Sequence, residues 1–338
     1  STRVVADEGL FAPSQLTPPF HQTRVLGSIA RVRENIYWDT IVLNDKHDVD
    51  TLKKSFKYYA GTGRKTYLPQ GVILWHIVLT KDDLLAMMED PASQYEVGIS
   101  DIIRSFNGVK TFPAERITPI SGWASATFIS RDGLLITNYH VVREQIEALH
   151  RESGCSGEVP APYLLAEIAR VRGGRIVEWV PVRSLDLVAN LSSTDWQGGL
   201  DGALLRVRDS DAHEFLPVRS TPPSVGEPVW VYGFPYATHR TPSRLRRIGY
   251  TNADQTLRVS FGRVTQLKAP DFIVDADGIN GDSGGPTIDR NGSLLGYVWD
   301  IYGQSISARV TSFAGGDIIV SAQTALQRLK QLQPCVKR

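Results

Sequence analysis

Short apolar runs dominate the last two thirds of the chain and alternate with turn-forming residues. From about residue 111, segments such as SATFIS, GLLITN, PVWVYGF and SLLGYVWD recur at close spacing. Many short β-branched segments separated by Gly, Pro, Asn and Asp are typical of an all-β barrel or sandwich. In ATFISRDGLLITN, the pair Asp132-Gly133 separates two such segments and predicts a tight hairpin.

The first third of the chain has a different pattern. Residues 1–30 are rich in Pro, Gln and Thr, which predicts an extended arm. The apolar segment 71–80 predicts a buried strand. The segment 81–90 begins with acids and ends before Pro91, which predicts a short helix.

Two further helices are predicted, over 142–152 and over 321–332, where the second closes the chain. We therefore predict two domains. Residues 1–110 form an N-terminal α+β extension of unknown role, and residues 111–338 form an all-β domain that ends with a helix.

Composition narrows the function classes. The chain has 338 residues, of which 42% are hydrophobic and 22% charged, and its formal net charge is +1. This balance predicts a soluble globular protein with no general attraction to nucleic acid or to an anionic membrane. No apolar run is long enough to span a bilayer. The first residues lack the apolar stretch of a signal peptide, and we expect a mature form of a secreted or periplasmic protein.

The two cysteines, Cys155 and Cys335, do not form a metal-type or redox-type pair. The sequence leaves open whether they form a disulfide. No metal or organic cofactor is implied, and a homodimer is one hypothesis about assembly.

The motif GDSGGP at 281–286 carries the strongest chemical signal. It places Ser283 directly after an acid and flanks the pair with glycines. That order suits an exposed hydroxyl with backbone N–H groups beside it, which is the arrangement of a serine nucleophile and its oxyanion hole.

A serine nucleophile needs a general base, and His140 is the best placed of the seven histidines. It follows the predicted strand LLITN and precedes a predicted helix, so a rigid strand end would hold it at a cleft. His76 lies inside an apolar strand and is better explained as a core or sheet-face histidine.

Asp201 is the candidate acid that orients the base, because it stands between glycines just before the apolar strand ALLRV. A carboxylate buried there needs a partner, and His140 would supply one. A plain turn aspartate is the alternative, and Asp186 and Asp195 are further candidates. The chain order His, Asp, Ser and the absence of a GxSxG motif argue against an α/β-hydrolase.

The motifs GDSGGP, ITNYHVV and LDGALLRV together resemble the chymotrypsin-fold, trypsin-like serine peptidases over roughly residues 111–330. The resemblance implies a double β-barrel with His140 and Asp201 on the first barrel and Ser283 on the second. It also implies an oxyanion hole built from the backbone N–H groups of Gly281 and Ser283, and a peptide or protein substrate.

A finer resemblance concerns the bacterial dipeptidyl peptidases of the 7/11 type, which share segments similar to ADEG, DGLLITNYH, DGALLRVR and GFPYATHR. The chain would be a short relative, since too few residues separate Asp201 from Ser283 for the helical domain of that family. The resemblance implies that Asp300 binds the amino terminus of the substrate. Trp299 beside it would form one wall of the substrate cleft, and packing in the core is the alternative.

A third acid, Asp277, lies six residues before Ser283. In trypsin-like enzymes an acid at that offset forms the floor of the primary substrate pocket and selects Arg or Lys. The alternative is that Asp277 has only a local role in a turn.

We therefore expect a serine peptidase that works through an acyl-enzyme. Whether it is a dipeptidyl aminopeptidase or a trypsin-like endopeptidase stays open at this point. A non-catalytic binding protein on the same scaffold is the other alternative, and it is disfavoured because all three catalytic positions and the glycines are filled.

Overall fold

The structure is a computed structural model, and it describes residues 3–4, 22–43, 64–68, 71–80, 110–111, 123–146, 159–190, 201–209, 211–235, 257–269, 271–278, 281–301 and 307–312. The chain divides into two compact units. The first comprises Ser1–Arg33, Trp123–Tyr236 and Ala253–Arg338, and the second comprises Glu34–Gly122 and Ala237–Asn252. The division at residue 110 stays a prediction.

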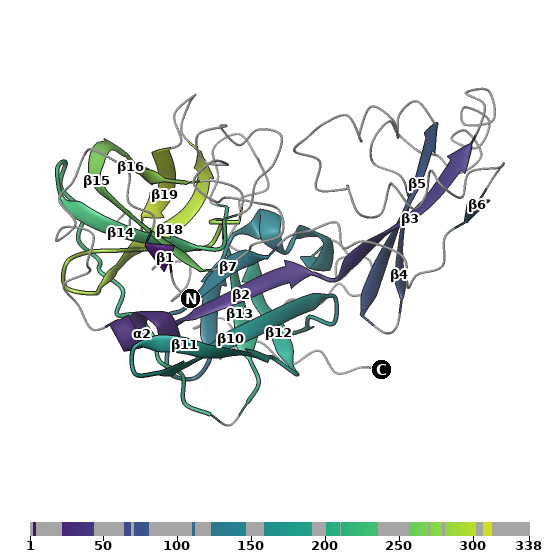
Figure 1. Ribbon diagram of the computed structural model, residues 1–338, viewed down its shortest axis with the longest axis horizontal. Coiled ribbons are helices and arrows are strands. Elements are labelled where there is room, and N and C mark those ends of the chain that lie inside the picture. Colours follow the sequence, from purple (N-terminus) through teal and green to yellow (C-terminus); the bar gives the residue numbers. More distant parts are fainter. Residues whose placement is uncertain are drawn as a thin grey trace. The chain divides into compact units, whose positions relative to one another are not determined.

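The first unit contains an eight-stranded sheet that forms the first barrel (Figure 1). The strand Leu134–Thr137 pairs antiparallel with Ala124–Phe128 on one side and with Ala203–Val207 on the other. In spatial order the strands are β11 (Arg175–Pro181), β10 (Leu164–Arg172), β2 (Ile29–Glu34), β7 (Ala124–Phe128), β8 (Leu134–Thr137), β13 (Ala203–Val207), β12 (Leu185–Asn190) and β9 (Val159–Pro160).

The second barrel follows in the same unit, and a pairing between β15 and β16 closes it. A closed sheet satisfies the backbone of every strand in the ring and leaves no open edge there. Its order is β15 (Arg258–Lys268), β14 (Pro228–Gly233), β17 (Pro286–Ile288), β18 (Leu294–Ile301), β19 (Ser307–Ser312) and β16 (Asp271–Asp277), with β1 (Arg3–Val4) parallel to β15. The all-β double barrel expected from the sequence is thus confirmed.

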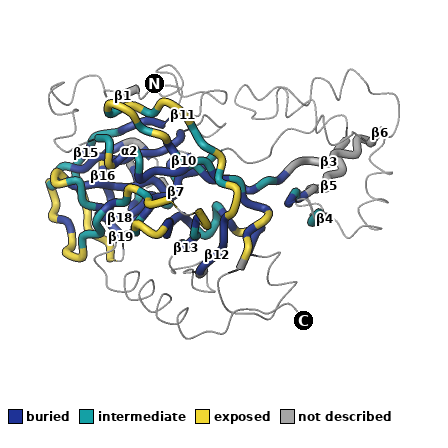
Figure 2. The backbone as a smooth tube through the Cα atoms, turned by 90° about the horizontal axis from the view of Figure 1, so that it is seen from below, coloured by how far each residue is buried: buried dark blue, intermediate teal, exposed yellow. Residues whose placement is uncertain are grey.

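The apolar runs are continuous because many strands are buried on both faces. In β14, Val229 and Val231 pack inside the second barrel, whereas Trp230 and Tyr232 belong to a cluster shared with strands of the first barrel. β8 alternates in the same way between that shared cluster and the interior of the first barrel. The buried segments of both barrels stand out in Figure 2. One apolar layer between the barrels therefore fixes how they meet.

The extended arm predicted over residues 1–30 is wrong for residues 22–30, whereas residues 5–21 lie outside the described residues. Gln22–Gly27 form the helix α2, and β2 pairs with β7 in the first barrel. Val25, Leu26 and Ile29 are almost fully buried in the cluster between the barrels. Six residues are too short a helix to produce a periodic sequence signal, which is why composition gave the wrong prediction.

The second unit contains a four-stranded sheet in the order β4 (Arg64–Leu68), β5 (Val72–Thr80), β3 (Ile36–Leu43) and β6 (Lys110–Thr111). β3 and β5 run parallel, and β4 pairs antiparallel with β5. The predicted strand at 71–80 is therefore confirmed as β5. His76 lies on this strand, and its side chain is outside the described residues.

The other predicted helices are only partly covered. Residues 143–146 are helical, as expected for the start of the segment 142–152. The segments 81–90 and 321–332 lie outside the described residues, as do Cys155 and Cys335.

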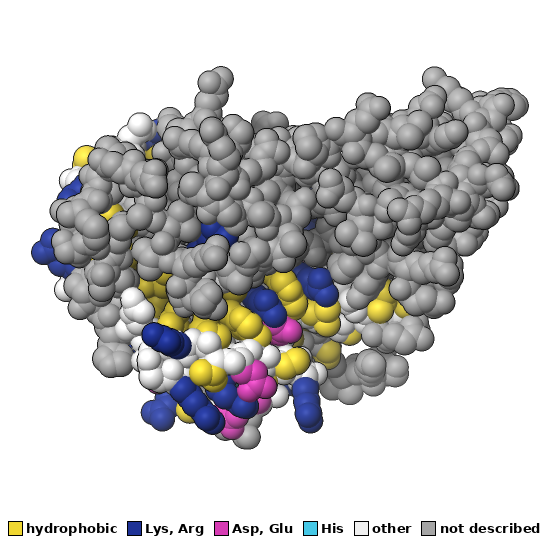
Figure 3. Space-filling view, in the orientation of Figure 1, with side chains coloured by type: hydrophobic (Ala, Val, Ile, Leu, Met, Phe, Trp, Pro, Cys, Tyr) yellow, Lys and Arg dark blue, Asp and Glu magenta, His cyan; other side chains and the backbone are white. Residues whose placement is uncertain are grey.

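The described surface carries charges of both signs. Figure 3 shows Lys and Arg side chains beside Asp and Glu side chains on the lower part of the visible face. The exposed pair of Arg170 and Glu178, 2.6 Å apart, joins β10 to β11. Among the described residues, no helix is long and apolar enough to cross a membrane.

Candidate active site

The hairpin of β7 and β8 leads directly to His140. Gly133 closes its turn with φ +83°, and a Cβ at this position would lie 2.8 Å from the carbonyl oxygen of Val207. Only glycine meets both conditions, so the Asp-Gly turn predicted from the sequence is confirmed. Asp132 also binds Arg206 of β13 at 2.6 Å, which ties the hairpin turn to the strand that follows Asp201.

His140 lies in a single 3₁₀ turn, η2 (Tyr139–Val141), at the end of β8. The residue before the turn, Asn138, is fully buried and makes no side-chain cap to it. Its Nδ2 donates instead to the backbone carbonyl of Asp201 at 2.9 Å. Sequence reasoning missed Asn138, although an amide at the end of the apolar run LLIT was a visible signal.

Asp201 stands two residues before β13 and makes two bonds to His140. Its Oδ1 accepts from the backbone N–H of His140 at 3.0 Å, and its Oδ2 lies 2.5 Å from Nδ1 of the imidazole. These contacts fix the imidazole plane relative to the backbone that carries it. The alternative acids do not lie there: Asp186 is buried in β12 and bound to Arg208, and Asp195 is outside the described residues.

The second imidazole nitrogen, Nε2, lies 3.0 Å from Oγ of Ser283. An ionised carboxylate can only accept hydrogen bonds, so Nδ1 carries the proton and Nε2 accepts from the serine hydroxyl. The side chains of His140 and Asp201 are 33% and 16% exposed, so the imidazole meets solvent while the carboxylate is sheltered. The structure thus brings Asp201, His140 and Ser283 together, and hydrogen bonds link the three side chains in that order.

Ser283 belongs to a tight turn, 281–285, which we call the nucleophile turn. Gly281 and Gly284 have φ of +99° and +79°, a region that L side chains rarely adopt. A Cβ on Gly284 would lie 2.0 Å from the backbone carbonyl of Ser125. The glycines of GDSGGP therefore allow the turn to lie directly against β7 of the first barrel.

Two buried hydroxyls of β7 bind the nucleophile turn. Oγ of Ser125 donates to the carbonyl of Gly281 at 3.1 Å, and Oγ1 of Thr127 donates to the carbonyl of Gly284 at 3.3 Å. The backbone N–H of Ser125 donates to the carbonyl of Ser283 at 2.8 Å. From β8, Oγ1 of Thr137 donates to the carbonyl of Ser125 at 2.7 Å.

The opposite side of the nucleophile turn contacts β18. The N–H of Gly284 donates to the carbonyl of Val298, and the N–H of Val298 donates to the carbonyl of Gly285. Tyr297 beside it is fully buried. Burial raises the pKa of Tyr297, and the negative charge of Asp201 raises it further, so the phenol is neutral.

The predicted substrate-binding residues lie on strands that flank the nucleophile turn. Asp277 ends β16 and pairs with Ser307 of β19, and Asp300 of β18 pairs with Arg309. The side chains of both acids are outside the described residues.

Trp299 is half-buried beneath a cation. The guanidinium of Arg309 lies 4.3 Å from the centre of its ring and binds Asp271 at 2.8 Å. Burial raises the pKa of Asp271, and the charge of Arg309 opposes that rise. One face of Trp299 therefore packs against a fixed cation, which agrees with a structural role for that face.

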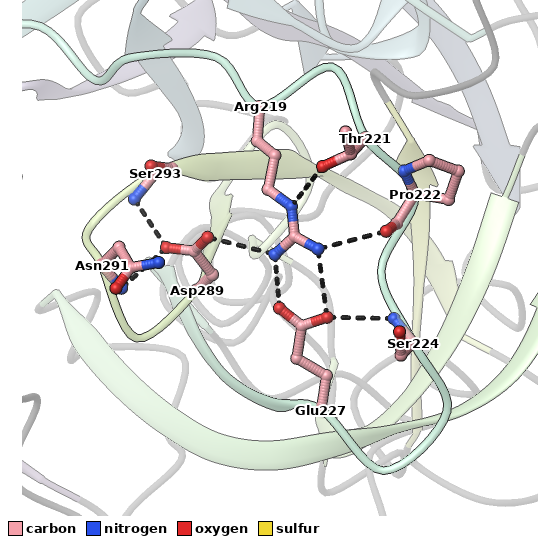
Figure 4. Close-up of polar contacts among 8 residues, drawn as sticks. All are labelled: Arg219, Thr221, Pro222, Ser224, Glu227, Asp289, Asn291 and Ser293. Carbon is pink, nitrogen blue, oxygen red and sulfur yellow. Dashed lines mark hydrogen bonds and ion pairs between the residues drawn. The ribbon is translucent and has the colours of Figure 1, made fainter.

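The other end of β17 carries an ionic cluster around Arg219, which lies on the connector between the two barrels (Figure 4). Its guanidinium binds Glu227, and it binds Asp289 at 3.1 Å. It also donates to Thr221 and to the carbonyl of Pro222. All five N–H donors of Arg219 thus have acceptors, as a fork of fixed geometry allows.

Both carboxylates of this cluster also accept from backbone. Asp289 accepts from the N–H groups of Asn291 and Ser293, and Glu227 accepts from the N–H of Ser224 (Figure 4). Burial by itself would raise the pKa of Glu227, but the bonds from Arg219 and Ser224 outweigh it and lower the pKa. We call Arg219, Glu227 and Asp289 the Arg219 cluster.

Among the residues that the structure describes, no group of three or more His, Cys, Asp or Glu side chains lies close enough together to hold a metal ion.

Comparisons with known proteins identify a family for the chain. A family profile described as the trypsin-like peptidase domain matches residues 124–296, about half of the chain. That segment holds His140, Asp201 and Ser283. A comparison with curated proteins found no match.

Solved structures that resemble the chain are serine proteases. They include an inactive form of the Rv3671c protease, with 20% identity, 60% of this chain and 83% of that chain covered, and a TM-score of 0.37. An inactive mutant of Rv3671c from M. tuberculosis H37Rv has 20% identity, coverages of 63% and 84%, and a TM-score of 0.38. The serine endoprotease from Yersinia pestis has 18% identity, coverages of 63% and 59%, and a TM-score of 0.39.

Proposed function

The chain belongs to the trypsin-like peptidase family and is a serine peptidase, and on that premise we propose that Ser283 is its nucleophile, His140 its general base and Asp201 the orienting carboxylate. The observation that carries this assignment is the unbroken sequence of hydrogen bonds from Asp201 through the imidazole to Oγ of Ser283. The fixed tautomer leaves Nε2 free to accept the serine proton.

The proposed reaction follows from these positions. Oγ of Ser283 attacks the scissile carbonyl while its proton passes to Nε2 of His140. The backbone N–H groups of Gly281 and Ser283 donate hydrogen bonds to the carbonyl oxygen and stabilise the negative charge that develops on it. His140 then gives the proton to the leaving amine, and an acyl-enzyme forms. Water releases the acyl group by the same route, with His140 again as the base.

Labelling with a fluorophosphonate probe tests the nucleophile without knowledge of the substrate. Oγ of Ser283 forms a bond to phosphorus, fluoride leaves, and the serine proton goes to His140. We expect the wild-type protein to be labelled, Ser283→Ala to show no labelling, and Ser293→Ala to match the wild type. Ser293 is a fitting control because it lies beyond the other end of β17 and contributes a backbone N–H. Equal labelling of wild type and Ser283→Ala would overturn the assignment.

For substrate choice, we propose recognition of a free amino terminus by Asp300, as in a dipeptidyl aminopeptidase. The support is positional: Asp300 lies on β18, two residues after Val298, whose backbone binds the nucleophile turn. A carboxylate at that point of the strand would meet an ammonium group a short distance from the scissile bond. Arg309, its cross-strand neighbour, is bound to Asp271.

A paired peptide library tests this choice. Free dipeptidyl substrates should be cleaved and their acetylated forms spared, and Asp300→Asn should raise KM for the free forms. Cleavage of acetylated peptides after Arg or Lys would instead support the trypsin-like endopeptidase. In that case Asp277→Asn should remove the preference for basic residues.

A further inference from the structure

The buried hydroxyl of Ser125 on β7 donates to the carbonyl of Gly281, one of the two residues proposed to form the oxyanion hole. This inference deepens the proposed function and rests on it. We propose that Ser125 is a positioning residue for the oxyanion hole: its hydroxyl holds the Gly281 carbonyl so that the N–H groups of Gly281 and Ser283 point at the same substrate oxygen.

Three buried hydrogen bonds join Ser125 to the nucleophile turn and to β8. Its N–H donates to the carbonyl of Ser283 at 2.8 Å, and its Oγ donates to the carbonyl of Gly281 at 3.1 Å. Its own carbonyl accepts from Thr137 at 2.7 Å. The side chain is fully buried, so no solvent competes for the bond to Gly281.

The Gly281 carbonyl needs such a restraint. Gly281 has φ +99°, a value reached mainly by glycine, and glycine has several other backbone conformations of similar energy. Rotation at Gly281 would change the angle between the peptide that carries its own N–H and the peptides that lead to Ser283. The Gly281 carbonyl has two described donors, Oγ of Ser125 and the N–H of Phe234 at 3.3 Å. The hydroxyl bond is the shorter of the two.

Thr127 provides a matched comparison on the same strand. Its hydroxyl is equally buried, and it also donates to a carbonyl of the nucleophile turn, that of Gly284 at 3.3 Å. The Gly281 carbonyl belongs to the peptide between the two N–H groups of the proposed oxyanion hole, whereas the Gly284 carbonyl lies after Ser283 and outside that segment. Loss of either hydroxyl removes one buried hydrogen bond from the fold, but only loss of the Ser125 hydroxyl weakens the restraint on Gly281, whose carbonyl then keeps the longer bond from the N–H of Phe234.

The test measures the second-order rate constant for fluorophosphonate labelling in Ser125→Ala, Ser125→Thr and Thr127→Val. The phosphoryl oxygen of the probe occupies the position of the substrate oxyanion, so its rate reports on the two N–H donors. Complete loss of one such donor costs about 100-fold or more, and loosening it should cost about 10-fold. We expect that loss in Ser125→Ala, recovery in Ser125→Thr, and a rate within about twofold of wild type in Thr127→Val.

Two further measurements separate positioning from stability. Tm should fall by similar amounts in Ser125→Ala and Thr127→Val, and all rates are taken well below the lowest Tm. The pH profile of labelling should keep its shape in Ser125→Ala, because the imidazole and its carboxylate are untouched. Should Ser125→Ala not fold, Ser125→Cys takes its place, because its thiol is a weak donor and predicts an intermediate rate.

The outcomes are distinct from those that test the proposed function. Labelling of Ser125→Ala at the wild-type rate, or an equal loss in Ser125→Ala and Thr127→Val, overturns the positioning role while the nucleophile assignment stands. Absence of labelling in the wild-type protein overturns the proposed function itself.

Discussion

The two ends of the short strand β17 are held by opposite kinds of polar contact. Before the strand, the nucleophile turn is bound by neutral hydroxyls and backbone groups that are fully buried. After the strand, Asp289 is bound by the half-buried cation Arg219, which also binds Glu227. The same strand thus joins a neutral anchor from the first barrel to an ionic anchor from the connector.

The difference follows from what each end must do. A negative charge develops beside the nucleophile turn during the proposed reaction, and a fixed ion there would raise or lower its energy at long range. Neutral donors restrain the backbone without adding such a field, and they do not titrate. The connector needs only to be fixed in place, and the Arg219 cluster achieves this with bonds that depend on pH and salt.

The largest expected effect tests the carboxylate of Asp201, which is bound to His140. In Asp201→Asn, the amide would donate toward Nδ1 of His140 and impose the wrong tautomer, so Nε2 could no longer accept the serine proton. We expect the labelling rate to fall about 10⁴-fold. Tm should change little, since both anchors of β17 remain. A rate within tenfold of wild type would contradict the proposed role of Asp201.

Next in size is a pair of glycine substitutions, one in each turn. Gly284→Ala would place a methyl group 2.0 Å from the Ser125 carbonyl, so β7 and the nucleophile turn must separate. We expect a loss of unfolding free energy of at least about 3 kcal/mol, together with loss of labelling.

Gly292→Ala, at φ +77° in the turn after β17, should cost only about 1–2 kcal/mol and leave the labelling rate unchanged. Both variants are measured by denaturant unfolding. Equal costs would show that close packing does not distinguish the two turns.

A smaller effect is expected from the ionic anchor. Arg219→Met keeps much of the side-chain volume but leaves the buried Asp289 and the partly buried Glu227 without their cation. Because Arg219 is partly exposed, we expect a loss of about 2 kcal/mol in unfolding free energy and no change in the labelling rate. Arg170→Met, which breaks an exposed pair with Glu178, is the control and should cost less than about 0.5 kcal/mol.

The smallest expected effect is on the stability of the fold at low pH. The pKa of Glu227 is lower in the folded state than the ordinary value of about 4.3, so its ionised form stabilises the fold. That contribution is present above about pH 4.3 and is lost as pH falls through the lower folded pKa. Thermal unfolding between about pH 5 and 2.5 should therefore show a steeper decline in wild type than in Glu227→Gln. Parallel curves for the two proteins would show that the ionised form of Glu227 does not stabilise the fold.

The residues with local signals were predictable from the sequence. Alternating apolar segments predicted the barrels, and the Asp-Gly turn predicted the hairpin that carries His140. GDSGGP predicted a tight turn around Ser283, because only glycines reach its backbone angles and allow its contact with β7. These features depend on neighbours in sequence or on steric limits of single residues.

The residues that support the site depend on contacts far along the chain. Nothing in the segment ASATF indicates that the Ser125 hydroxyl meets Gly281, which lies 156 positions away. Asp186 lies within a strand and Asp201 lies just before one, and only the fold shows that Arg208 binds the first and His140 the second. The role of Arg219 was hidden for the same reason, since its partner Asp289 is 70 positions away.

The pairing of β2 with β7 has a consequence for how this chain could be rebuilt. Val32 lies opposite Ala124, yet the residues Glu34–Gly122 come between them in the chain. In the chain, the larger segment of the second unit takes the place of the hairpin turn between these strands, and the entropy of closing such a connection grows only slowly with its length. Modules of other sizes could be grafted between these strands, or exchanged in evolution, while β7 keeps its register and Ser125 its place.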